Sequence, residues 1–140
     1  MAPMKVRLYI QRATDLFNGM QLTRGDDLYK NSSALLAIHS AISYTDALRT
    51  GLGEENLSDD NHNQTAAALR RLLNARNVRE QNGIDHLQYL VSRKSLVSYG
   101  DERLSENEFR GLVTKAERFA KWANGIGKQL RIEGWNHDDQ

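Results

Sequence analysis

The chain has 140 residues, the length of one domain, which is enough to bury a hydrophobic core without disulfides. It contains no cysteine, which excludes a disulfide framework, a thiolate metal site and a cysteine nucleophile. The formal net charge is +1, so any surface for nucleic acid must be a local basic patch. No stretch is apolar enough for a signal peptide or a membrane span, so we expect a single soluble domain over residues 1–140, located in the cytoplasm.

The spacing of apolar residues predicts a first helix from about Met4 to Thr23. The single proline, Pro3, precedes it, so no proline interrupts the helices that follow. Asp26 or Asp27 can cap a second helix, which is predicted from about Leu28 to Leu52.

A glycine- and acid-rich stretch at 51–63 is typical of a loop. A third helix is predicted from about His62 to Arg79, and a glycine-containing break follows it. Asp85, with Gln88 three residues later, is a plausible cap for a fourth helix that ends near Tyr99.

The last helix has the strongest signal in the chain. Ser105 as N-cap and Glu108 three residues later form a capping box, and Leu104 can pack on Phe109 as a hydrophobic staple. Apolar residues then continue on one face to about Leu130, and the tail from Gly134 is expected to fray. No window alternates as a strand does, and short connections favour antiparallel neighbours. The sequence therefore predicts an all-α fold, an antiparallel bundle of about five helices.

The predicted second helix carries a polar line formed by His39, Ser43 and Asp46, at i, i+4 and i+7. This line either belongs to a site or is a solvated stripe at the edge of the bundle. His62 opens the third helix, where the helix dipole disfavours a charged imidazole. It is either a residue of the cap region or a ligand contact.

Lys94 falls in register with the apolar residues of the predicted fourth helix. A lysine on that side must extend to solvent, pair with an acid such as Asp46, or serve a site. Arg93 precedes it and Tyr99 follows. Further basic residues occur earlier in the chain, on what can equally be a solvated face: Arg70, Arg71, Arg76 and Arg79.

Motifs for metals, nucleotides or nucleophiles are absent from the sequence. There is no H-E-x-x-H, no histidine pair at helical spacing, no P-loop, no Rossmann fingerprint and no serine nucleophile elbow. We therefore expect no metal and no cofactor, and the sequence assigns no catalytic residue.

Two segments resemble HEPN domains, a superfamily of nucleotide-binding helical bundles: residues 32–53 followed by 59–73, and residues 90–124. They are most similar to a bacterial subgroup with an alanine-rich second helix. The element Asp60-Asn61-His62 and the segment from Lys94 to Tyr99 match motifs of that subgroup. The resemblance implies a HEPN-like bundle that forms a homodimer.

HEPN ribonucleases carry an arginine, four to six residues and then a histidine, near the end of the helix before the last. Here the matching stretch begins at Arg93, but Ser98 and Tyr99 stand where the histidine is expected. Tyrosine is a poor proton acceptor near neutral pH, since its unperturbed pKa is about 10. Arg79 and His86 have a matching spacing but straddle the predicted helix break, so we interpret that match as coincidence.

The resemblance implies a protein that binds a nucleotide, RNA or a protein partner without ribonuclease activity. Its expected site residues are Asp46, Arg93, Lys94 and Tyr99, with His39 and His62. A nucleotidyltransferase-like protein or an antitoxin is an implied partner. Two alternatives stay open. One is an endoribonuclease of toxin–antitoxin type that uses His39 or His62 as acid–base, and the other is a plain interaction scaffold.

Overall fold

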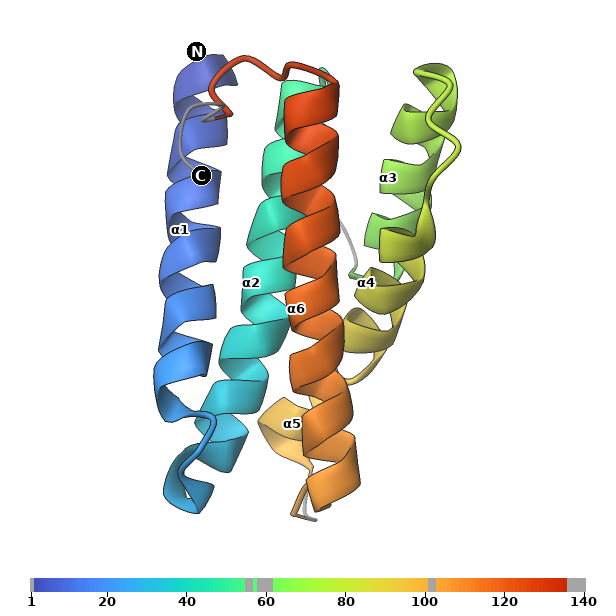
Figure 1. Cartoon of the computed structure of the whole chain (residues 1–140). Coiled ribbons are helices and arrows are strands. Elements are labelled where there is room, and N and C mark those ends of the chain that lie inside the picture. The colour runs from blue at the N-terminus through green and yellow to red at the C-terminus, as the bar shows by residue number, and fades with distance from the viewer. Residues whose placement is uncertain (1, 55–56, 58–61, 101–102, 136–140) are drawn as a thin grey trace.

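A computed structural model describes residues 2–54, 57, 62–100 and 103–135 (Figure 1). These residues form five helices of eleven or more residues, one shorter helix and one 3-10 turn, and they contain no strand. The elements are α1 (Ala2–Thr23), η1 (Asp27–Tyr29), α2 (Lys30–Gly51), α3 (His62–Ala75), α4 (Asn82–Ser92), α5 (Lys94–Tyr99) and α6 (Glu106–Gln129). The predicted all-α class, with five helices packed together, is confirmed.

Several predicted boundaries differ from the observed ones. The predicted second helix begins as the 3-10 turn η1, which is capped by Asp26 through a bond from the Leu28 backbone N–H. The fourth helix begins at Asn82, with Gln81 at the N-cap position, so the predicted cap at Asp85 is wrong. It also ends at Ser92, and α5 continues after Arg93.

The central element is α2, which packs against α1 and α6 and also contacts α3, α4 and α5. Helices that follow one another, such as α1 and α2 or α3 and α4, run antiparallel, whereas α2 and α6 run in the same direction (Figure 1). Lys30 pairs with Glu106 at 3.2 Å where both helices begin. Gly51 lies against Ile132 where both end.

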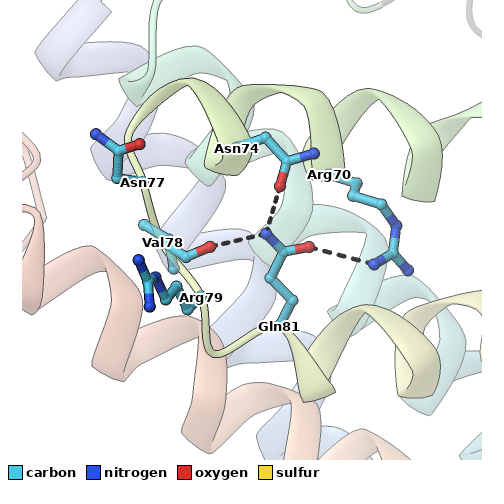
Figure 2. A pocket seen from close by; sticks show the side chains of 6 residues that line it. All are labelled: Arg70, Asn74, Asn77, Val78, Arg79 and Gln81. Carbon is cyan, nitrogen blue, oxygen red and sulfur yellow. Dashed lines mark hydrogen bonds between the residues drawn. The ribbon is translucent and has the colours of Figure 1, made fainter.

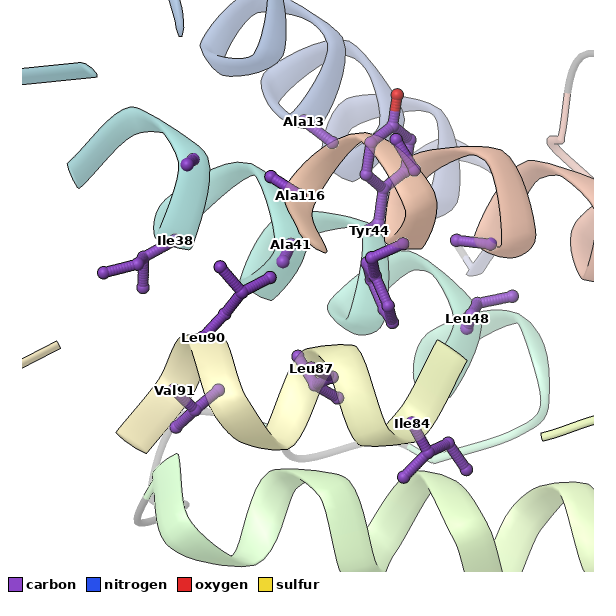
Figure 3. Close-up of a cluster of buried hydrophobic side chains, with 14 of the residues drawn as sticks. Ala13, Ile38, Ala41, Tyr44, Leu48, Ile84, Leu87, Leu90, Val91 and Ala116 are labelled. Carbon is purple, nitrogen blue, oxygen red and sulfur yellow. The ribbon is translucent and has the colours of Figure 1, made fainter. Parts of the chain in front are cut away.

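Figure 3 shows the part of the core where α2 and α4 meet α6. Ala41 and Ala116 keep the helices close, and Leu87 and Leu90 of α4 fill the space beside them. Because α2 is covered on most sides, several of its polar side chains are buried as well: Ser33, Ser40, Ser43, Thr45, Arg49 and Thr50.

Two glycines provide close contacts for the two tryptophans. A methyl group at Gly83 would overlap the indole of Trp122, and one at Gly127 would overlap that of Trp135. Trp135 is buried and donates from its Nε1 to Asn124 Oδ1 at 3.1 Å. The expected fraying at Gly134 is therefore wrong as far as Trp135, and residues 136–140 lie outside the described range.

Candidate anion-binding site

Basic and aromatic side chains line one edge of the contact between α4 and α6. Three of them lie on one face of α4 and its C-cap, at i, i+3 and i+7. Two more lie one turn apart on α6. We call this set the basic edge, and its members are His86, Tyr89, Arg93, Lys115 and Arg118.

Tyr89 brings two of these cations to the same place. The Cζ of Arg93 lies 5.0 Å from the centre of the Tyr89 ring, and the Nζ of Lys115 lies 4.9 Å from it. The electron-rich faces of an aromatic ring attract cations at such distances. The half-buried ring therefore holds a guanidinium from the end of α4 beside an ammonium from α6, although the two like charges repel one another.

The guanidinium of Arg93 keeps an unused donor. Its Nε is buried and has no hydrogen-bond partner in the part of the chain that the structure describes. Leaving such a donor unsatisfied costs about 1–3 kcal/mol, so a partner that reaches it gains correspondingly. The neighbouring acid is Glu108, whose oxygen Oε1 accepts from the Ser105 backbone N–H at 3.1 Å.

The electrostatics around His86 are dominated by positive charge. Burial, followed by the cations of Lys115 and Arg118, lowers the pKa of His86 below its ordinary value. Asp85 and Glu80 act in the opposite direction but less strongly. The imidazole is therefore neutral near pH 7, when it can donate one N–H and accept one hydrogen bond.

The basic edge has the chemistry of an anion site. Among the described residues, no ion pair involves Lys115 or Arg118. Arginine and lysine at such positions are the usual donors to phosphate, arginine as a planar fork and lysine as a point charge. Lys115 and Arg118 can therefore bind an anion without first breaking an internal salt bridge.

A second polar surface lies where α3 turns into α4 (Figure 2). This shallow recess is lined by Arg70, Asn74, Asn77, Val78, Arg79 and Gln81. The side chain of Gln81 donates to Asn74 Oδ1 and to the Val78 carbonyl, both at 2.8 Å, and accepts from Arg70 at 3.2 Å. Because these groups largely satisfy one another, the recess stabilises the turn rather than presenting a ready site.

The predicted site residues do not all come together. The amide of Asn31 donates to the Val97 carbonyl at 3.4 Å, which ties α5 to the first turn of α2. Asp46 lies about four turns further along α2, on the order of 20 Å away along the helix axis. The structure therefore does not bring Lys94 and Asp46 within the reach of an ion pair.

The remaining predicted residues have mixed surroundings. On α2, His39 and Asp46 are half-buried, and Ser43 between them is buried, so the polar line is not a fully solvated stripe. The side chain of His62, the first residue of α3, lies outside the described residues. Tyr99 is 83% exposed at the end of α5. Among the predicted site residues, Arg93 belongs to the basic edge.

A buried charge at the end of α2 was not predicted from the sequence. Arg49 is almost fully buried, and its Nε donates to Glu54 Oε1 at 3.0 Å while its Nη2 bonds the second carboxylate oxygen. The backbone N–H of Glu54 also donates to the Arg49 carbonyl at 3.0 Å. In the sequence, Arg49 falls at helical spacing on the same side as the apolar residues Ile38 and Ile42. This spacing was the signal from which its burial could have been predicted. This pair fixes the end of α2 and is structural.

No family model, curated protein or solved structure matches the chain. None of the helices in the described ranges has an apolar stretch long enough to span a bilayer. The same residues contain no group of three or more histidine, aspartate or glutamate side chains placed to hold a metal ion. The candidate site therefore depends on its own geometry and chemistry.

Proposed function

We propose that the protein is a HEPN-like helical bundle that binds a phosphate-bearing ligand, an RNA or a nucleotide, on the basic edge and does not cleave it. The observation that carries this proposal is the Tyr89 ring with Arg93 and Lys115 both about 5 Å from its centre. Holding two like charges together on a half-buried ring costs free energy, because they repel one another. A surface that binds nothing gains no attraction that offsets this cost. The two cations suit a ligand that brings negative charge to that point.

A local basic edge is consistent with the near-neutral chain. Contacts to phosphates supply most of the affinity of proteins for nucleic acids, and they come mainly from arginine and lysine side chains. The net charge of +1 means that such contacts must be concentrated on one surface. The basic edge is a surface of this kind, and it involves two helices that pack against one another, α4 and α6.

The proposed absence of cleavage is supported by the residues at the position of the expected histidine. Ser98 is half-buried and Tyr99 is exposed, and neither side chain is an imidazole. General acid–base catalysis, which contributes about 10²–10⁴-fold, is therefore not available from that position. We propose that the ligand is bound and not turned over.

A second candidate function is an endoribonuclease, and one observation favours it. The pKa of His86 is lowered by burial and by Lys115 and Arg118, so its imidazole is available as a base beside cations that can hold a phosphate. The sequence alone offers His39 or His62 for this role. A plain interaction scaffold is the third candidate.

The test measures binding and cleavage of mixed single-stranded RNA by wild type, Arg93→Gln, Lys115→Gln and His86→Gln. Losing the charge-assisted contact of Arg93 or of Lys115 should weaken binding at least about tenfold, and binding should weaken further as salt rises. Arg12→Gln is a matched control, because Arg12 also lies over a tyrosine ring, at 5.7 Å from the centre of Tyr9 on α1. That variant should bind as wild type does.

Each other outcome selects a different function. RNA cleavage by wild type that disappears in His86→Gln, His39→Ala or His62→Ala would establish the endoribonuclease. Equal weak binding by wild type and all variants, without cleavage, would leave the scaffold as the remaining candidate.

A further inference from the structure

Building on the proposed function, we infer that the basic edge recognises a terminal phosphate, either a phosphate monoester or a polyphosphate, in preference to the internal phosphodiesters of a strand. A mononucleotide and the phosphorylated end of an RNA both present this chemical group. Two features of the basic edge favour such a group, namely how closely its cations are gathered and how many there are.

The cations converge on one place. Arg93 and Lys115 share the Tyr89 ring, and Lys115 also acts on His86 together with Arg118. Lys115 therefore belongs both to the two cations at the Tyr89 ring and to the two cations that act on His86. Along α4, the distance from His86 to Arg93 is only about 10 Å, since a helix rises 1.5 Å per residue. A surface that follows a strand would instead distribute its cations along the path of the backbone.

The charge of the cluster suits a dianion. An internal phosphodiester carries a single negative charge, whereas a terminal phosphate carries about −1.5 to −2 at pH 7 and offers three strong acceptor oxygens. Arg93, Lys115 and Arg118 together supply three positive charges. The nearby acids are Glu108 and Glu80, each of which accepts a backbone N–H at the start of a helix, and Asp85, which lies 3.9 Å from Arg70. When Arg70 is counted, four cations face three carboxylates, so a net positive charge remains for the ligand.

The uncommitted donors match the acceptors of such a group. Arg93 Nε is buried and lacks a partner among the described residues, and Lys115 Nζ is in contact with the ring rather than with a carboxylate. His86 in its neutral form adds one N–H. Donors on these three side chains match the three oxygens of a terminal phosphate in number, whereas a phosphodiester has two non-bridging oxygens and chain on both sides.

The experiment compares RNA oligonucleotides of one sequence that end in a 5′-phosphate, a 3′-phosphate or hydroxyl groups at both ends, each with an internal fluorescent label. We expect at least about tenfold tighter binding of a phosphorylated oligonucleotide, and loss of this preference in Lys115→Gln and Arg118→Gln. Arg12→Gln should keep the preference, and Lys115→Arg, which retains the charge, should keep most of it. Circular dichroism checks that each variant is folded.

Two further arms identify the source of the phosphate. Adenosine monophosphate and inorganic pyrophosphate are added as competitors, and the ring protons of His86 are followed by NMR. Competition by the mononucleotide would assign the site to nucleotides, and competition by neither would assign it to the end of an RNA. A shift of the His86 signals on addition of the phosphorylated ligand, absent in Lys115→Gln, is expected in both cases.

The failures of the two proposals are distinguishable. Equal binding of phosphorylated and unphosphorylated oligonucleotides, weakened alike by Lys115→Gln, would overturn the inference and leave the proposed function standing. A preference that survives in both Lys115→Gln and Arg118→Gln would place the terminal phosphate elsewhere and also overturn the inference. If no oligonucleotide, adenosine monophosphate or pyrophosphate were bound, both the inference and the proposed function would be overturned.

Discussion

At the scale of single residues, Ser105 has an effect that can be measured without knowing a ligand. Its hydroxyl accepts from the Glu108 backbone N–H at 3.1 Å, and the Glu108 carboxylate accepts from the Ser105 N–H in return. Ser105→Ala should lower the free energy of unfolding by about 1 kcal/mol in a urea melt, because the N–H loses its acceptor. Thr14→Ala, at an exposed position within α1, should change it by only a few tenths of a kcal/mol.

The same cap predicts a pH dependence. Hydrogen bonds from Ser105 and the nearby charge of Arg93 lower the pKa of Glu108 in the folded chain. A lowered carboxyl pKa stabilises the fold above the ordinary glutamate range, and that stability is lost as the pH falls through the lowered value. The stability difference between wild type and Ser105→Ala should therefore shrink on acidification. A difference that stays constant from neutral pH to pH 3 would contradict this role of Glu108.

At the scale of helices, the contact between α4 and α6 depends on a glycine. Gly83→Ala should destabilise the protein by about 1–3 kcal/mol, because the added methyl group overlaps the Trp122 indole. Moving that ring would also strain its Nε1 bond to the Glu80 carbonyl, which is 3.1 Å long. Denaturant melts followed by tryptophan fluorescence give both the stability and the environment of the ring.

Gly125→Ala is the matched control within α6. No atom lies within 4 Å of the added methyl group, so the substitution should stabilise the helix by about 0.5–1 kcal/mol. If both glycine variants were stabilised, the close packing of α4 on Trp122 would be wrong.

The boundaries of α4 and α6 show what the sequence can predict about the elements. The start of α6 was predicted correctly because a capping box is local: Ser105 and Glu108 lie one turn apart. The start of α4 was not, because Gly83 resembles a helix breaker until Trp122, far along the chain, covers it. Packing between distant segments overrides local propensity at such positions.

The contacts of the candidate site likewise differ in how far the sequence predicts them. Tyr89 and Arg93 are four residues apart on one helix, so their contact was visible in the sequence as a spacing. Lys115 and Arg118 join them only because α6 docks beside α4. Lys94 directly follows Arg93 in the chain, but its expected partner Asp46 lies several turns away along α2. Contacts within one helix were predictable, and contacts between helices were not.

At the scale of the whole molecule, the HEPN-like resemblance predicts a two-fold dimer. Several large apolar side chains are exposed at the end of the bundle that carries the α1–α2 turn and α5 (Figure 1): Leu22, Leu28, Tyr29, Leu96 and Tyr99. Burying them against a second copy would remove apolar area from water. Light scattering should give the mass of a dimer for wild type and of a monomer for the double variant Leu28→Ser, Tyr99→Ser.

Two results would count against this dimer. A monomeric mass for wild type at high concentration would exclude it, and a dimeric double variant would move the interface away from this end. Leu8→Ser, which changes an exposed leucine near the start of α1, is the control and should leave the mass unchanged.

The contact between the two ends of the described chain has a consequence for how fast the protein folds. Gly134, with φ at +93°, lies against the carbonyl of Pro3 at the start of α1, and Ile132 beside it packs on Gly51. Closing a loop that includes nearly the whole chain costs more entropy than pairing neighbouring helices, and folding slows as contacting residues lie further apart in sequence. We therefore expect slower folding than in a helical bundle whose contacts are local. The contact of Gly134 with Pro3 should be among the last events of folding, since it joins the two ends of the described chain.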